Sequence, residues 1–131
     1  MSKRILDEIS RINSHIEQAR KLANEDIKNH VIFTALSMEC FQAINASIDL
    51  GEEIVTRNKL GFPDTYTQTF EILSKRNFID NQDLKSIKQL IFFRNLIAHE
   101  YYKITEKEIR KILELFTSLE KLVEIAKKFK S

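Results

Sequence analysis

The scarcity of residues that break helices constrains the fold of this chain more than any other feature. Its 131 residues include only 2 glycines and 1 proline. A protein of many short strands needs frequent turns rich in these residues, whereas long helices need few of them. Hydrophobic residues make up 43% of the chain and charged residues 31%, a balance that excludes a disordered chain. The sequence therefore predicts an all-α protein built from a few long helices.

Apolar residues recur at steps of three and four over most of the chain, which is the spacing of one helix face. The length favours one domain of residues 1–131, folded as an up-and-down bundle of about five helices. The first two predicted helices lie at 5–23 and 30–57, and the third lies between a loop at 58–65 and a break at 76–81. The fourth runs from that break through the segment that contains Arg94 and His99, with Tyr101 just beyond its end. The fifth runs from a capping box of Thr105 and Glu108 to about Ala126.

Several helix ends carry recognisable signals. Thr65 or Asp64 is a candidate cap for the third helix, and Asn81 or Asp80 for the fourth. Gly51 lies inside the second helical segment, where we expect it to weaken the helix or end it. That second segment is apolar around much of its circumference, so it is expected to touch the core on one side and a partner on another.

Charge and cysteine content limit the classes of function. The net charge is only +2, from 21 basic and 19 acidic residues, so nucleic-acid binding would require a local patch. The single cysteine, Cys40, lies in an apolar run and excludes a disulfide framework, which favours a reducing, cytoplasmic setting. No apolar signal core opens the chain, and no continuous apolar stretch approaches the roughly eighteen residues of a membrane span, so no membrane association is expected.

The segment from Phe93 to Tyr101 concentrates the chemically useful side chains. Arg94 is charged at any relevant pH and suits phosphate oxygens. His99 can take or give a proton near neutral pH, and Tyr101 offers a hydroxyl. Together these groups are suited to cutting a phosphodiester or to carrying a phosphoryl-type modification.

This segment also resembles a known family. Arginine, four residues, histidine, one residue and tyrosine form the signature of the HEPN superfamily, and the flanking residues resemble its HepT branch. The likeness extends to 41–50 and 61–73, and covers roughly residues 30–120. The resemblance implies the toxin of a HEPN/MNT toxin–antitoxin pair, a metal-independent endoribonuclease acting on tRNA or mRNA. It also implies a cognate MNT nucleotidyltransferase that neutralises the toxin by transferring AMP to Tyr101.

The helical spacing of the motif raises a geometric problem. At about 100° per residue, Arg94 and His99 lie about 140° apart on an ideal helix, whereas Arg94 and Tyr101 lie about 20° apart. Either the helix ends or distorts near His99, or a second chain completes the site. A two-fold dimer would oppose each motif to its copy. The HEPN resemblance implies this second solution, a homodimer with both motifs lining one cleft.

The resemblance also suggests a role for each residue of the motif. His99 would act as general acid or base, Arg94 would hold the scissile phosphate, and Asn95 would orient Arg94 or contact RNA. No metal or other cofactor is implied. Structural roles are the alternatives: Arg94 could pair with a carboxylate, His99 could cap helix carbonyls, and Tyr101 could pack.

A second function class stands beside the nuclease. The chain could be a non-catalytic helical partner or substrate of a separate nucleotidyltransferase. Cleavage of RNA by the purified chain, lost on substitution of His99, would distinguish the two. No other residues offer comparable chemistry: His15 and His30 lack the spacing of metal ligands, and no glycine-rich phosphate loop is present.

Overall fold

The protein is an all-α bundle, as the sequence predicts. A computed structural model describes residues 2–129, and this range holds five α-helices, one 3-10 turn and no strand. The elements are α1 (Lys3–Ala23), α2 (His30–Arg57), α3 (Tyr66–Lys75), α4 (Asn81–Glu100), the 3-10 turn η1 (Tyr101–Lys103) and α5 (Glu106–Lys127).

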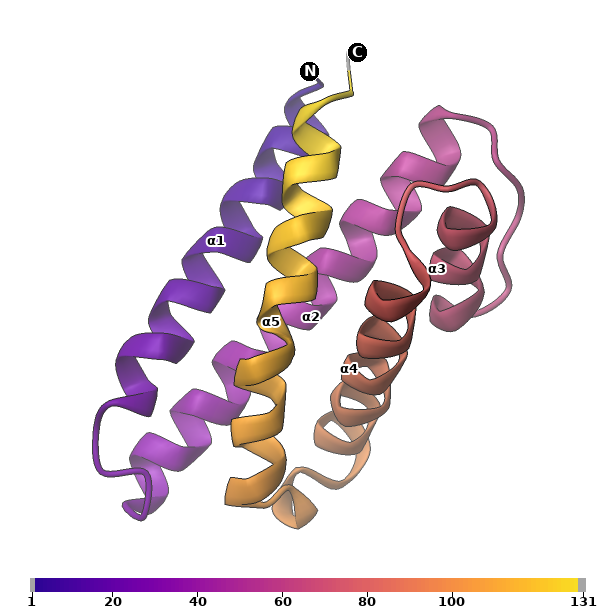
Figure 1. The fold of residues 1–131 in the computed structure, drawn as a ribbon. Helices are drawn as coiled ribbons and strands as arrows, with labels where there is room; N and C mark the ends of the chain where they lie inside the picture. Colours follow the sequence, from indigo (N-terminus) through magenta and orange to yellow (C-terminus); the bar gives the residue numbers. More distant parts are fainter. Residues whose placement is uncertain (1, 130–131) are drawn as a thin grey trace.

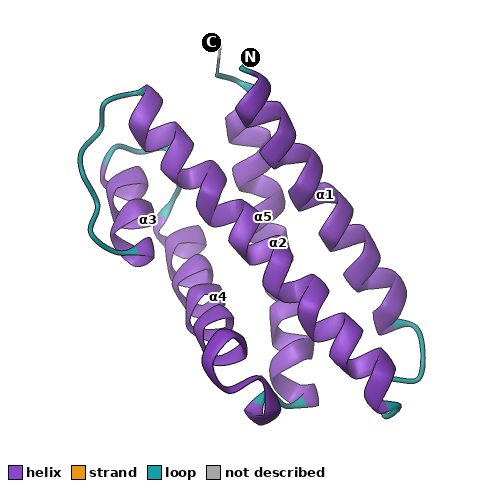
Figure 2. Cartoon of the chain, turned by 180° about the vertical axis from the view of Figure 1, so that it is seen from behind, coloured by secondary structure: helices purple, strands orange, loops and turns teal. Residues whose placement is uncertain are grey.

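The helices pack around α2 (Figure 1). Helices α1 and α2 form the most extensive pair and run in opposite directions, and α5 packs against α1, α2 and α4. Figure 2 shows the short α3 beside α4, on the side of α2 away from α1. The beginning of α1 and the end of α5 lie at the same end of the bundle. Helix α2 therefore contacts each of the other four helices.

Helix α2 is also, within the described residues, the one helix that is long and apolar enough to cross a membrane by length and composition. A central helix of a helical bundle meets the same test. Its apolar surface here is covered in part by α1, α3, α4 and α5, which accounts for its composition.

Side chains cap the helices where the sequence indicated a start. Thr65 caps α3 and Asp80 caps α4, which settles both open alternatives. At α5 the expected capping box is present: the Thr105 hydroxyl accepts from the Glu108 backbone N–H, and the Glu108 carboxylate accepts from the Thr105 N–H. These caps satisfy backbone donors that helix starts otherwise leave unpaired.

Gly51 does not end the second helix, contrary to the expectation from its sequence. Helix α2 continues through Gly51 to Arg57. The reason is packing, since a Cβ atom at residue 51 would lie 2.8 Å from Cζ of Phe70 on α3. Glycine at this position lets the Phe70 ring, which is fully buried, pack directly on the backbone of α2. The cost in helix propensity is thus offset by a close approach of α3.

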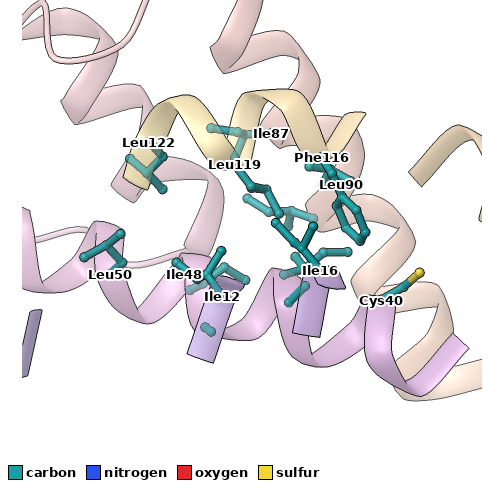
Figure 3. Close-up of a cluster of buried hydrophobic side chains, with 14 of the residues drawn as sticks. Ile12, Ile16, Cys40, Ile48, Leu50, Ile87, Leu90, Phe116, Leu119 and Leu122 are labelled. Carbon is teal, nitrogen blue, oxygen red and sulfur yellow. The ribbon is translucent and has the colours of Figure 1, made fainter. Parts of the chain in front are cut away.

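The core joins all the long helices (Figure 3). Ile12 and Ile16 of α1, Leu90 of α4 and Phe116 of α5 meet the buried side of α2. Cys40 is fully buried in this cluster, as its apolar setting predicts. Because α2 and α4 share this core, the partly exposed sides of the two helices are held in a fixed relation to each other.

Candidate active site

The sequence motif lies in the last two turns of α4. Arg94 is half-buried, whereas Asn95 and His99 are exposed. The helix ends at Glu100, one residue after His99, where the backbone takes φ −144° and ψ 55° and the chain enters η1. The sequence left two ways to bring Arg94 and His99 together, a helix end near His99 or a second chain. The first of these, the helix end, is present within a single chain.

Arg94, Asn95 and His99 line one surface hollow. Ile91 from the same helix contributes to it, and residues 64–67, from the α2–α3 loop and the start of α3, form the opposite wall. Asn95 and His99 are one turn apart and share a side of α4. The Arg94 guanidinium approaches Asn95, with Nη1 2.9 Å from its side-chain oxygen. The length of the arginine side chain thus bridges the angular gap.

Two amide oxygens hold the Arg94 guanidinium. Nε donates to the side-chain oxygen of Asn45 on α2 at 2.7 Å, and Nη1 donates to that of Asn95. No carboxylate of the described chain lies within ion-pair distance of Arg94, so the alternative of a structural carboxylate pair is not what the structure contains. Of the five N–H donors of an arginine, three remain available.

Two aromatic rings also contact the guanidinium. The Arg94 Cζ atom lies 5.1 Å from the ring centroid of Phe41 on α2 and 5.1 Å from that of Tyr66 on α3. Each cation–π contact of this kind contributes about 0.5 to 1 kcal/mol at exposed sites and about 2 kcal/mol when desolvated. These contacts help to hold the guanidinium in place while leaving three of its N–H groups without an acceptor in the described residues.

The start of α3 fixes the Tyr66 ring beside Arg94. The Thr65 hydroxyl accepts from the Gln68 backbone N–H at 3.0 Å, and the Gln68 side chain accepts from the Asp64 N–H at 2.7 Å. Tyr66 is the first residue of α3, immediately after the cap. The reciprocal capping therefore sets the position of the tyrosine that stacks on Arg94.

His99 is an exposed titratable group of the hollow, which the exposed residues Asp64 and Tyr66 also line. Within residues 2–129 its ring makes no hydrogen bond or ion pair, and the neighbouring Glu100 is paired with Lys103 instead. An exposed imidazole without a protein partner can exchange its proton with a ligand. A basic guanidinium and an imidazole in one hollow form a combination that can bind a phosphate and move a proton beside it.

Tyr101 lies outside this hollow. It directly follows α4, is 69% exposed, and packs edge-on to Tyr102, whose side chain is 71% exposed. The two tyrosines line a separate hollow with residues of α2, among them Phe33 and Met38. Within one chain the structure therefore brings Arg94, Asn95 and His99 together and places Tyr101 at an adjacent position.

The remaining histidines occupy other environments. His15 on α1 lies 2.7 Å from a carboxylate oxygen of Glu39 on α2, so it pairs these two helices. His30 is exposed at the first residue of α2. Over the range that the structure describes, no group of three or more His, Cys, Asp or Glu side chains is placed to hold a metal ion.

Asn45, Phe41 and Tyr66 also belong to the site, although the local sequence did not mark them. All three contact the Arg94 guanidinium, from two other helices. One signal was available: Asn45 is an uncharged polar residue within a strongly apolar helix, one turn after Phe41. That spacing places the amide and the ring on one side of α2, but it does not identify their partner.

The chain is similar in sequence to a known family and to a curated relative. A family model described as "Ribonuclease HepT-like" matches residues 5–129. A curated relative, the mRNA nuclease HepT of Shewanella oneidensis, is 22% identical over 107 residues, which cover 79% of this chain and 80% of the relative.

Several solved structures share the fold. A toxin–antitoxin structure with AMP-PNP superposes with a TM-score of 0.90 at 16% identity, over 98% of this chain and 100% of that one. The tri-AMPylated Shewanella oneidensis HEPN toxin, in complex with its MNT antitoxin, gives 0.89 at 19% identity over 98% and 100%. The cytosolic protein YutE of Bacillus subtilis, of unknown function, gives 0.78 at 18% identity over 92% and 87%.

Proposed function

Because this chain belongs to the ribonuclease HepT-like family, we propose that it is the toxin of a toxin–antitoxin pair and a metal-independent endoribonuclease acting on mRNA or tRNA. The observation that carries the proposal is the Arg94 guanidinium, held without a carboxylate partner, in the same exposed hollow as His99. A half-buried cation whose charge is not neutralised is well suited to bind a phosphodiester.

The reaction follows from the chemistry of RNA. Attack by the ribose 2′-oxygen on the adjacent phosphorus forms a P–O2′ bond and breaks the P–O5′ bond. Arg94 holds the phosphate and stabilises the negative charge that develops on its oxygens. A base must take the 2′-hydroxyl proton, and an acid must give a proton to the leaving 5′-oxygen. We assign both tasks to His99, because an imidazole can accept or donate a proton near neutral pH.

A two-fold dimer would supply both proton-transfer groups at once. One His99 would accept the 2′-hydroxyl proton while the partner subunit's His99, as imidazolium, would protonate the leaving oxygen. Exposed apolar side chains support such an interface. Phe92 on α4 is 62% exposed and lies one turn before Asn95, and Met38 on α2 is 49% exposed. Large apolar side chains exposed near the proposed site are typical of a protein contact.

We further propose that a cognate MNT-type nucleotidyltransferase neutralises the chain by transferring AMP to Tyr101. The similarity to a tri-AMPylated toxin supports this, as does the exposure of Tyr101 directly after α4. An added phosphate at the end of α4 would repel the RNA backbone, and its bulk would narrow access to a cleft formed by two motifs. The reaction would take place in the cytoplasm, where RNA and ATP are available.

Expression in a bacterial host tests this function. We expect induction of the wild-type chain to stop growth, His99→Ala to restore it, and co-expression of a cognate nucleotidyltransferase to restore growth in the wild type. A non-toxic wild-type chain that still binds the nucleotidyltransferase stably would overturn the nuclease proposal. It would instead favour the non-catalytic partner considered from the sequence.

A further inference from the structure

We propose that Asn45 is a positioning residue for Arg94, and that its neutral amide matters because it orients the guanidinium without cancelling its charge. The hydrogen bond itself does not depend on what the protein does. The consequence for RNA binding rests on the proposed function, so the tests below separate the two.

Asn45 contacts Arg94 from α2, the central helix of the bundle. It is half-buried on α2, between residues 43–44 and 46–48, all of which are buried in the core. Its side-chain oxygen accepts from Nε of Arg94 at 2.7 Å, a short hydrogen bond that joins α2 to α4. The anchor therefore belongs to the core helix and not to the mobile end of a loop.

The hydrogen bonds to Asn45 and Asn95 determine which N–H groups of Arg94 remain free to bind a ligand. Asn45 engages Nε and Asn95 engages Nη1, which leaves one N–H on Nη1 and both on Nη2. These three donors lie at the outer end of the guanidinium. Phe41 and Tyr66 contact the guanidinium and limit the space in which it can move. A phosphate that enters the hollow would meet a guanidinium that is already held in place, with N–H groups free on both terminal nitrogens.

The neutrality of the anchor has a chemical consequence. A carboxylate at position 45 would accept the same Nε proton but would form an ion pair with the guanidinium. Arg94 would then be held as firmly and would attract phosphate less. A residue that served only to join α2 to α4 would tolerate this change or benefit from it, because charge-assisted hydrogen bonds are the stronger ones.

RNA binding by a cleavage-deficient protein tests the charge argument. In a His99→Ala background, we expect Asn45→Asp to weaken binding of a short single-stranded RNA by about tenfold or more at low salt. The slope of log affinity against log salt should fall by about 0.7 for each Arg94 that is neutralised. Unchanged affinity and slope in Asn45→Asp would overturn the inference.

The matched control is Asn13→Asp. Asn13 is exposed on α1, which makes no contact with α4 in the described chain, and the substitution changes the net charge by the same amount. We expect it to leave RNA affinity close to that of the parent. An equal loss in both variants would show a general charge effect and would also overturn the inference.

A second measurement does not require RNA. In ¹⁵N-labelled protein the Nε–H signal of Arg94, assigned through Arg94→Lys, should exchange slowly with water. Asn45→Ala should accelerate that exchange by about tenfold or more, while the backbone spectrum keeps its dispersion. Asn45→Asp should keep the protection, since it retains an acceptor.

The two measurements distinguish failure of the positioning role from failure of the proposed function. A protected Nε–H that Asn45→Ala exposes, in a protein that neither binds nor cuts RNA, would support the positioning role and contradict the proposed function. An Nε–H that exchanges at the same rate with and without the Asn45 amide would overturn the positioning role, whatever the protein does to RNA.

Discussion

The side-chain oxygen of Asn45 on α2 lies 2.7 Å from Nε of Arg94 on α4, across 49 positions of sequence. This contact links the core helix to the motif that the sequence marked as chemically active. It also means that Arg94 is not an isolated surface charge: an amide on either side and two aromatic rings hold it beside His99.

Gly51→Ala should destabilise the protein although alanine is the better helix former. The added methyl group would lie 2.8 Å from Cζ of the fully buried Phe70. Overpacking costs about 1 to 3 kcal/mol, and alanine regains at most about 1 kcal/mol of helix propensity. We expect a net loss of about 1 kcal/mol in the free energy of unfolding, measured by urea denaturation. In a Phe70→Leu background the loss should shrink, and a stabilising Gly51→Ala in the wild type would contradict the packing described here.

Phe92→Glu should prevent dimerisation without unfolding the helices. Phe92 is 62% exposed on α4, near the proposed cleft, and a charge there would oppose burial against a second copy. By light scattering at micromolar concentration we expect the wild type at about twice the chain mass of 15.4 kDa and the variant at that mass. The matched control is Leu6→Glu, because Leu6 is 51% exposed on α1, which does not pack directly against α4 within residues 2–129. A monomeric wild type would refute the dimer.

Tyr101→Phe should escape AMP transfer, whereas Tyr102→Phe should not. The two side chains are almost equally exposed, at 69% and 71%, so they form a natural pair of variants. After incubation with the cognate nucleotidyltransferase and ATP, intact-mass measurement should show one or more AMP units on the wild type and on Tyr102→Phe. Peptide mapping that places the modification on Tyr102, or an antitoxin that neutralises Tyr101→Phe by binding alone, would sink this part of the proposal.

Cys40 should be chemically inert in the folded protein. Burial raises the pKa of its thiol from 9.0 to about 12. Folding therefore favours the protonated thiol: this contribution to stability is fully present below about pH 9 and is lost as the pH rises through about 12. At pH 8 we expect reaction with a disulfide reagent to be at least about a hundredfold slower in the native protein than in urea. Equal rates would mean that Cys40 is not buried.

The helices were largely predictable, because a periodic apolar pattern depends on local sequence alone. Ile5, Ile9, Ile12 and Ile16 are all buried on α1, as their spacing predicts. The capping box at Thr105 was also readable, since its two partners are three residues apart. The continuation of α2 through Gly51 was not predictable, because it depends on packing against Phe70, which belongs to a different helix.

The site was predictable only in part for the same physical reason. Arg94 and His99 are close in sequence, so their combination was visible, and the structure places both in one hollow. The contact between Asn45 and Arg94 depends on how α2 packs against α4, which no local pattern encodes. On an ideal helix, Arg94 and Tyr101 would lie about 20° apart. In the structure the chain turns after Glu100, and this turn places Tyr101 in a different hollow from Arg94.

The proposed roles of Arg94 and His99 can be tested directly by substitution. Both can be replaced with modest structural cost to the core, since His99 is exposed and Arg94 is half-buried. Circular dichroism and the thermal midpoint of each variant therefore serve as the folding controls for an activity measurement.

Cleavage of RNA by the purified chain in the presence of EDTA tests the central claim most directly. We predict that the wild type cuts a defined mRNA or tRNA with chelator present, and that His99→Ala and Arg94→Ala each lower the rate by about a hundredfold or more while remaining folded. Cleavage that disappears with EDTA, or a folded His99→Ala variant that cuts at the wild-type rate, would contradict the mechanism.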